Sequence, residues 1–286
     1  MDTDHSIAVW AWETGSKIAS ATGHPHRIFC AAFNPSDDSI VTVGVGIVKF
    51  WSVTGRLLRG KSGQFTQGSR EQAMLSLTIS KKGRIYSGSE QGEIYRWKGA
   101  EVDTLVMAHE GPVFCLWVCR DGLCSGGKDG KVMVWSLNLK PLVTFDLRSQ
   151  STGLDRTRIR SVCWLAKTIL VGTIHSEVFE IDIESGTPNS LLTGHCAGKV
   201  SFSFVCINVH SLLFFFAEFV SLFLRTCKTA PNLETRPETC IPQLSQVNGL
   251  QTHPSKRVFV TGGADKTVRV WDMDTRKQVR GSGFRV

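Results

Sequence analysis

Six short apolar runs in this chain each end on an aromatic or apolar anchor, at nearly even intervals. The anchors are Trp10, Trp51, Trp97, Trp135, Ile181 and Trp271. Successive anchors lie 41, 46, 38, 46 and 90 residues apart, and five of them close the similar phrases HSIAVW, GIVKFW, GEIYRW, GKVMVW and KTVRVW. The chain therefore contains an internal repeat of about 40 residues, interrupted once. A repeat of that length is one supersecondary unit that buries its apolar face only against its neighbours.

The repeat is clearest in the unit from His109 to Phe145. Its apolar runs, PVFCLWV, LCSGG, KVMVW and LVTF, are rich in Val and aromatic residues, which favour strands. Turn sequences at 120–122 and 128–130 separate the first three runs, and their Asp-Gly pairs supply the positive φ of tight hairpins. The unit therefore predicts a four-stranded antiparallel sheet.

Units with a period near 40 residues and a closing Trp are typical of the blades of a WD40 β-propeller. We therefore predict an all-β propeller of about six blades, of which the first and the last are incomplete. The units are a two-strand remnant at 1–22, blades at 24–59, 72–107, 109–146 and 157–193, and a split sixth blade at 195–198 and 247–280. Sheets of this kind avoid open edges by closing into a ring, so we expect these units to be part of a larger, tandem propeller.

Four side chains of the clearest unit resemble the buried network of WD40 blades, namely His109, Ser125, Asp129 and Trp135. The same spacing of hydroxyl, carboxylate and indole recurs as Thr261, Asp265 and Trp271. A carboxylate that accepts from an imidazole, with a hydroxyl linked to an indole N–H, satisfies groups that are costly to bury alone. A hydrolase triad is the competing interpretation, but the recurring spacing and the lack of a GxSxG sequence favour a structural role. We therefore predict no catalytic residue.

The composition describes a soluble globular protein, with 42% hydrophobic and 20% charged residues. The nine Cys are scattered without CxxC pairs and no signal peptide opens the chain, so we expect free thiols in the cytosol. We predict no metal and no cofactor, because His24 and His26 lack further ligands nearby and no Gly cluster matches a phosphate-binding loop. The net charge of +8 suits an acidic partner, but without a clustered basic tract no nucleic-acid partner is predicted.

The long interval before Trp271 contains a segment foreign to the repeat, from Lys199 to Gln246. These 48 residues contain no Gly and no Trp, whereas seven of the chain's 16 Phe lie between Phe202 and Phe223. We therefore divide the chain into propeller blades at 1–198, an insertion at 199–246, and the remainder of the last blade at 247–286.

Three interpretations of this insertion compete. The Phe-rich segment 200–224 is long enough for a membrane helix, but its polar residues and the division of a single blade count against a membrane span. A functional loop would expose a Phe-rich interface patch. We favour a retained intron, because the sequence 199–201 is what a splice donor encodes and a pyrimidine-rich tract encodes Phe, Leu and Ser. A CAG acceptor would then end in Gln246. No membrane partner is predicted.

Several phrases go beyond a general WD40 pattern, namely HSIAVWAWETGSKI, IVKFWSVTGRLL, HEGPVFCLWV, SGGKDGKVMVW, ILVGTIHSEVFEID and GLQTHPSKRVFVTGGADKTVRVWD. They resemble the echinoderm microtubule-associated protein-like family, in that family's order, over nearly all of the chain except 199–246. The resemblance implies two joined propellers, the first of which contacts tubulin, and a location on the cytoplasmic cytoskeleton. The family's amino-terminal coiled coil, its basic region and its hydrophobic motif are not in this sequence, which weakens the expectation of microtubule attachment.

The leading functional hypothesis is a non-enzymatic scaffold that binds tubulin or microtubules, and the alternative is a general WD40 adaptor in ubiquitin ligation or signalling. Aligning the first strands of the blades gives one equivalent position near the central channel, occupied by Phe29, Met74, Phe114, Arg160 and Asn248. Aromatic residues, Met and Arg are enriched at protein interfaces, so these five are candidate partner-binding residues. Packing between blades is the competing role for them.

Overall fold

The computed structural model describes residues 6–11, 13–22, 25–65, 71–148, 157–165, 167–174, 177–193, 247–252, 257–263, 267–275 and 277–283. The predicted insertion at 199–246 lies outside these residues, and so do His24 and Asp265. All the regular secondary structure among the described residues is β-strand. This part of the chain accordingly contains no helix of the length and apolarity that a membrane crossing requires.

The strands form five sheets, which are antiparallel apart from one strand pair in the first of them. The first sheet has six strands, in the order β1 (Ser6–Ala11), β2 (Ser16–Thr22), β6 (Leu57–Ser62), β5 (Ile47–Thr54), β4 (Ile40–Gly44) and β3 (Ile28–Phe33). The second contains β7 (Met74–Ile79), β8 (Ile85–Ser89), β9 (Glu93–Lys98) and β10 (Glu101–Met107). The third contains β11 (Val113–Val118), β12 (Leu123–Gly127), β13 (Lys131–Trp135) and β14 (Pro141–Asp146). The fourth contains β15 (Ile159–Leu165), β16 (Thr168–Thr173), β17 (Glu177–Asp182) and β18 (Pro188–Thr193). The fifth contains β19 (Val247–Thr252), β20 (Val258–Gly263), β21 (Thr267–Asp272) and β22 (Gln278–Gly283).

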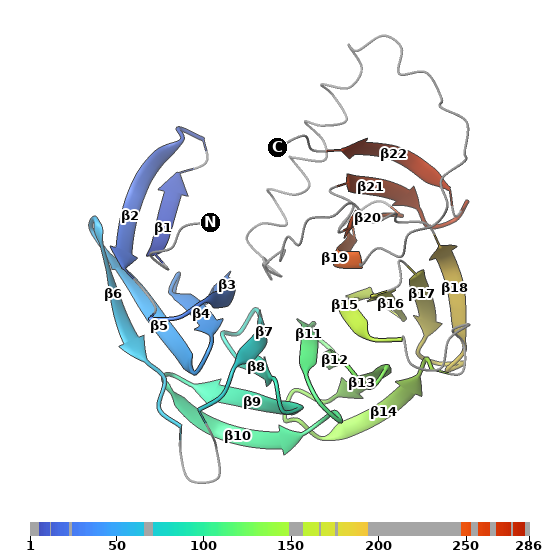
Figure 1. Ribbon diagram of the computed structural model, residues 1–286, viewed down its shortest axis with the longest axis horizontal. Coiled ribbons are helices and arrows are strands. Elements are labelled where there is room, and N and C mark those ends of the chain that lie inside the picture. Colours follow the sequence, from blue (N-terminus) through green and yellow to red (C-terminus); the bar gives the residue numbers. More distant parts are fainter. Residues whose placement is uncertain are drawn as a thin grey trace.

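The five sheets follow one another around an arc as the blades of a propeller (Figure 1). In each blade the first strand is innermost and the last is outermost, so that β3, β7, β11, β15 and β19 line the middle of the arc. Each of these inner strands contacts the inner strand of the next blade. The predicted all-β propeller is confirmed.

The hairpin of β1 and β2, predicted as the remnant of a separate blade, is attached to the first sheet. A single parallel pair, Ser20 with Leu57, joins β2 to β6, and this is why the described residues form five sheets rather than six. Ile7 and Val9 pack against the cluster that contains Trp51 of β5. The hairpin therefore covers the Trp51 side of the first blade.

The apolar core lies between neighbouring blades and not in one central mass. One cluster joins Val48 of the first blade to Leu77 of the second. Another joins Val132 of the third blade to Ile159 of the fourth. Each blade is therefore stabilised mainly by the blades on either side of it, as expected of a repeat architecture.

The first two blades are also linked by residues 63–65. Gln64 forms a parallel bridge to β10 of the second blade. The ring of Phe65 packs edge-on against Trp97 and Tyr95, with centroid separations of 5.4 and 6.0 Å. The connection between these blades thus contributes both a backbone pair and an aromatic contact.

Glycines in the second strand of a blade allow the next inner strand to approach closely. A Cβ atom at Gly88 would lie 2.7 Å from Val113 Cγ1 in β11, and one at Gly126 would overlap Ile159 Cγ2 in β15. The hydroxyl of Ser76 holds the first of these boundaries by donating to the carbonyl oxygen of Val113 at 2.9 Å. A side chain at either glycine would therefore push two blades apart.

Gly126→Ala is expected to lower the free energy of unfolding by about 1–3 kcal/mol, because the added methyl group overpacks the boundary with Ile159. Gly262 is the matched control, since it holds the corresponding position in β20 and no described atom lies within 4 Å of a Cβ built there. Gly262→Ala is expected to change stability by less than about 0.5 kcal/mol. Urea denaturation followed by far-UV circular dichroism measures both variants. Equal losses of unfolding free energy in the two variants would contradict the explanation that overpacking at the blade boundary causes the effect.

Candidate functional site

The inner strand of every blade contains a β-bulge at its second residue. In each inner strand the pairing register shifts around one residue, and the five bulge residues are Phe29, Leu75, Phe114, Arg160 and Asn248. The residue after the bulge is buried in the first four blades, whereas the bulge residue itself is partly exposed. A bulge adds an unpaired residue to a strand and re-aims its side chain. The bulges therefore present one side chain from each of these four blades at the same end of the inner strands.

This register corrects one of the five predicted partner-binding residues. Met74 is fully buried, and its pairing makes it equivalent to Val113, one residue before the bulge of β11. Leu75 occupies the equivalent, partly exposed position in the second blade. The backbone of Asn248 lies in the bulge of β19, but its side chain is not among the described ones.

Two of the bulge residues are aromatic rings that lie next to an arginine. The Arg160 guanidinium carbon lies 4.5 Å from the centroid of the Phe114 ring, although the two residues belong to different blades. The Arg27 guanidinium carbon lies 5.5 Å from the centroid of the Phe29 ring. A guanidinium in this position is attracted by the electron-rich face of the ring. Both arginines are thus held at the bulge end of the inner strands.

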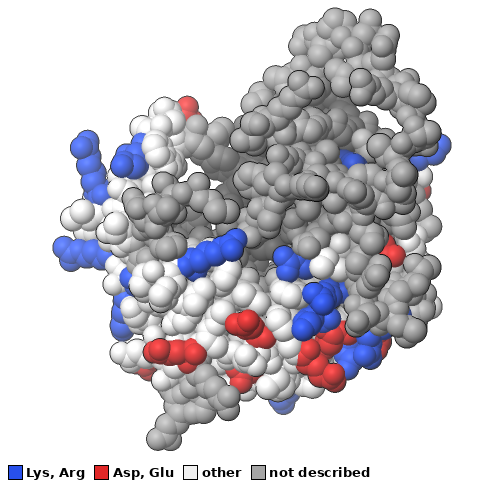
Figure 2. Space-filling model, in the orientation of Figure 1, with Lys and Arg blue, Asp and Glu red and all other residues white. Residues whose placement is uncertain are grey.

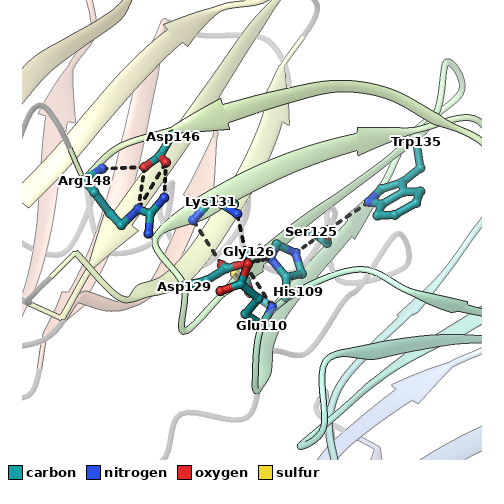
Figure 3. Close-up of polar contacts among 10 residues, drawn as sticks. His109, Glu110, Ser125, Gly126, Asp129, Lys131, Trp135, Asp146 and Arg148 are labelled. Atoms are coloured by element: carbon teal, nitrogen blue, oxygen red, sulfur yellow. Dashed lines mark hydrogen bonds and ion pairs between the residues drawn. The ribbon is translucent and has the colours of Figure 1, made fainter.

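The third blade contains a buried polar network (Figure 3). His109 precedes β11, and its Nδ1 atom lies 3.0 Å from Oδ1 of Asp129 in the turn between β12 and β13. The His109 Nε2 atom lies 2.8 Å from Ser125 Oγ, and the Trp135 indole N–H donates to the same oxygen at 2.9 Å. The side chains of His109 and Asp129 are only 0% and 3% exposed. The sequence-predicted set of four is therefore brought into one chain of hydrogen bonds.

The charge of Asp129 is stabilised by its neighbours. Burial by itself raises the pKa of this carboxyl, but the hydrogen bond and the charge of His109, with the amides of Lys131 and Glu110, outweigh it. The pKa of Asp129 therefore lies below its ordinary value. An ionised carboxylate that is buried and fully bonded joins the start of β11 to the β12–β13 turn.

His109, Ser125 and Asp129 have the order of contacts that a hydrolase triad would have, but their setting is different. The side chain of Ser125 is fully buried and its oxygen already accepts from Trp135. A nucleophile must reach a substrate, and this oxygen has no exposed surface. The arrangement is therefore suited to holding strands together.

Hydroxyl-to-indole bonds recur in other blades. Trp51 donates to Thr42, Trp97 to Ser87 and Trp271 to Thr261, over distances of 2.8, 2.9 and 2.8 Å. In the fourth blade the position of the indole is taken by Ile181 and that of the hydroxyl by Val171, and both are fully buried. Replacing both partners by apolar groups leaves no polar atom unpaired.

The second blade replaces the His–Asp pair by a network that sequence reasoning missed. The Tyr95 hydroxyl donates to the Glu93 carboxylate at 2.7 Å, and the Gln72 side-chain amide donates to both of them. The Gln72 side-chain oxygen accepts from the Gln91 amide at 3.2 Å. Tyr95 and Gln72 occur in a blade that lacks the expected Asp, and these two residue types were the signal that the sequence offered for the network.

Ser125→Ala is expected to lower the free energy of unfolding by about 1–3 kcal/mol, because it leaves buried groups of both His109 and Trp135 without this partner. Ser87→Ala removes the same hydroxyl from the second blade, where it serves the indole of Trp97 and a weak contact to Met74. We therefore expect the smaller loss for Ser87→Ala. Thermal and urea unfolding of the two variants measure the difference, and a larger loss for Ser87→Ala would contradict it.

Other reactive groups do not form a second site in the described part of the chain. Burial raises the pKa of Cys163 to about 11 and raises the pKa values of Cys124 and Cys119. These thiols are therefore protonated at neutral pH and poor nucleophiles. No three His, Cys, Asp or Glu side chains among the described residues gather as metal ligands would.

Comparison with known proteins places the sequence of this chain in one family. The model of the echinoderm microtubule-associated protein first beta-propeller matches residues 1–181. A model of the WD domain, G-beta repeat, matches residues 238–272, beginning inside the predicted insertion.

Three relatives illustrate the similarity. The 77 kDa echinoderm microtubule-associated protein of Strongylocentrotus purpuratus is 25% identical over 96% of this chain. Echinoderm microtubule-associated protein-like 2 of Mus musculus is 26% identical over 96% of it, and echinoderm microtubule-associated protein-like 1 of Homo sapiens is 32% identical over 67% of it. The chain spans only 33%, 35% and 24% of the lengths of these relatives. Because the family model covers more than half of the chain and the described sheets are propeller blades, the chain belongs to the echinoderm microtubule-associated protein family of WD40 β-propellers.

Proposed function

We propose that this chain is a non-enzymatic interaction module that associates with microtubules. The observation that carries the proposal is the family match over residues 1–181, because the matching relatives are named as microtubule-associated proteins. Location on the cytoplasmic cytoskeleton follows from the same proposal. A role without catalysis is supported by the third blade, where the groups that could form a triad are buried and bonded to one another.

The bulge end of the inner strands is the proposed contact surface. It combines partly exposed Phe29, Leu75 and Phe114 with the guanidinium of Arg160. Aromatic residues and Arg are enriched in interfaces because they give a large contact area and several hydrogen bonds. The net charge of +8 favours association with the acidic surface of tubulin.

Cosedimentation of the full chain with microtubules, at low and at physiological salt, tests this function. We expect binding at low salt that weakens as salt screens the charges. Microtubules from which a protease has removed the acidic carboxyl-terminal tails serve as the matched control and should bind less. Absence of binding at low salt would overturn the microtubule proposal and leave a general WD40 adaptor as the alternative, since a propeller fold alone does not determine the partner.

We also propose that residues 199–246 come from a retained intron, although the match to the WD domain begins at residue 238, inside this range. The connection from β18 to β19 is 53 residues long, whereas the connection from β10 to β11 is five and that from β14 to β15 is 12. The inner strands β15 and β19 are nevertheless in contact, so no long connection is needed to join these blades. Sequencing of spliced transcripts across codons 198 and 247 tests the proposal, and mature message that always carries the intervening codons would refute it.

A further inference from the structure

We propose that β6, the outer strand of the first blade, binds a short, extended, carboxylate-rich segment of another protein as an added strand. Arg56, Arg59 and Lys61 supply the contacting cations, and these three residues form the basic edge. The inference goes beyond the proposed function, because the basic edge lies on the outside of the arc, whereas the bulge residues belong to the inner strands (Figure 1).

The outer edge of β6 is open over most of its length. One side of the strand pairs with β5, but on the other side only Leu57 has a strand partner, Ser20 of β2. The next contact along this edge is the bridge of Gln64 to β10. Between these two points, five residues from Leu58 to Ser62 have no partner strand on this side among the described residues.

The backbone of this stretch can accept a strand. Gly63 donates its amide to the carbonyl oxygen of Val48 at 2.7 Å, on the β5 side. Backbone groups alternate in direction along an antiparallel strand, so the groups that point away from β5 belong to Leu58, Gly60 and Ser62. An exposed edge of this kind is the usual template for addition of an extended peptide.

The cations share one face of the strand. Leu58 is buried in the cluster that contains Trp51, and a Cβ atom at Gly60 would meet the Trp51 ring. Successive residues of a strand point to opposite faces, so Arg59 and Lys61 lie together on the other face, where both are exposed.

The charges of the basic edge are not neutralised by neighbouring side chains. In the described part of the chain, none of its three residues forms an ion pair or a side-chain hydrogen bond. Arg56 is exposed in the turn between β5 and β6, and Leu57 beside it is 62% exposed. A ligand would therefore meet three available cations and one apolar side chain.

This charge distinguishes β6 from the other outer strands. Between Asp38 and Glu71 the sequence has five Lys and Arg and no Asp or Glu. The outer strand β10 contains Glu101 and Asp103, β14 contains Asp146 and no Lys or Arg, β18 has no charged residue and β22 has a single cation. In Figure 2 the left edge of the molecule, where Figure 1 places β6, shows Lys and Arg side chains, and most of the visible Asp and Glu side chains lie along the lower rim.

The spacing of the cations matches an extended acidic segment. Arg59 and Lys61 are two residues apart, which is about 7 Å along a strand. Carboxylates at every second residue of an added strand have the same spacing, and opposite charges on neighbouring strands attract each other. Because the open stretch has five residues, a segment of about five residues is sufficient to fill it.

Other occupants fit this edge less well. Antiparallel pairing with β6 of a second copy, centred on Gly60, would place Arg59 opposite Lys61 of that copy, and like charges in that position repel. A nucleic acid has no alternating backbone donors and acceptors at strand spacing, and it typically neutralises about 6–10 phosphates with a matching number of cations. An acidic peptide satisfies both the edge and the charge.

The test is fluorescence anisotropy with the full chain and a short labelled peptide that alternates Glu and Thr. A second probe has Gln in place of each Glu, and a third has Pro in place of each Thr, which removes backbone donors and keeps the charge. We expect the Glu–Thr peptide to bind about tenfold more tightly than either of the others. Arg59→Glu and Lys61→Glu should each weaken its binding about fivefold or more. Arg120→Glu is the matched control, since it makes the same charge change in the exposed β11–β12 turn, and it should weaken binding less than about twofold.

The outcomes separate this surface from the microtubule function. Equal weakening by Arg120→Glu, or wild-type affinity in folded Arg59→Glu, would overturn the basic edge. Should Arg59→Glu fail to fold, wild-type affinity in Arg59→Gln overturns it instead. Equal binding of the Pro probe would overturn the added strand, and tighter binding of an RNA oligonucleotide that Arg59→Glu abolishes would overturn the choice of a peptide. Peptide binding that depends on Arg59 in a chain that does not cosediment with microtubules supports the basic edge and overturns only the proposed function.

Discussion

Trp97→Ala is expected to lower the free energy of unfolding by about 3–5 kcal/mol, the largest single effect in the second blade. The side chain of Trp97 is only 3% exposed, and its indole donates to Ser87 at 2.9 Å. Its ring also packs against Phe50 of the first blade and Phe65 of the connection, with centroid separations of 5.7 and 5.4 Å. The truncation thus leaves a cavity at the boundary of two blades, together with a buried Ser87 hydroxyl that keeps only its weak contact to Met74.

Trp10→Ala is the matched control, because Trp10 holds the same anchor position in the repeat but is 58% exposed on β1. Little packing is lost there, so a change within about 0.5 kcal/mol is expected. Trp97→Phe should fall between the two, since it keeps most of the bulk and loses the hydrogen bond. Urea denaturation followed by far-UV circular dichroism is suitable, because tryptophan fluorescence changes with the substitutions themselves. Comparable losses for Trp10→Ala and Trp97→Ala would refute the explanation.

Asp129→Ala is expected to cost about 3–5 kcal/mol at neutral pH, because it removes one partner of a buried charged contact and leaves His109 facing an empty space. The same carboxylate accepts from the amides of Glu110 and Lys131, so the start of β11 and the β12–β13 turn lose a common anchor. Asp37→Ala is the control. Asp37 is exposed in the turn after β3 and accepts from Ser39, and its loss should be small.

Asp129 should also determine part of the loss of folding stability at acidic pH. Its pKa in the folded chain lies below the ordinary value that applies after unfolding, so its contribution is complete above the unfolded pKa and is lost as pH falls through the folded one. Asp129→Asn keeps the size of the side chain and cannot titrate, so its unfolding free energy should decline less steeply over that acidic interval. Unfolding midpoints measured from neutral to strongly acidic pH give both slopes, and parallel curves would contradict the assignment.

The fold was predictable because its signals are local and repeated. The Trp spacing and the Asp-Gly turns predict the four-stranded unit, and β11 to β14 follow the predicted runs closely. The chain of contacts from His109 to Trp135 could also be anticipated, since the offsets between Ser125, Asp129 and Trp135 match a known blade pattern.

The positions around the bulges were less predictable. An alternation of apolar residues does not show where the extra residue of a bulge enters a strand. The sequence therefore predicted Met74 at the bulge position of the second blade, whereas the structure has Leu75 there. The network of Gln72, Glu93 and Tyr95 was missed because its residue types differ from those of the blade pattern. Contacts between blades, such as Arg160 with Phe114, depend on the spacing of the sheets in three dimensions.

The replacement of a hydroxyl and an indole by Val171 and Ile181 has a consequence for the recognition of repeats in other chains. The two positions are ten residues apart and are both aliphatic in this blade, and a single replacement would strand a donor or an acceptor in a closed interior. Surveys that count blades by their tryptophan will therefore undercount propellers. A search could accept a blade when these two positions hold either a hydroxyl and an indole or two aliphatic side chains. Such a search would recover the blades that those surveys omit.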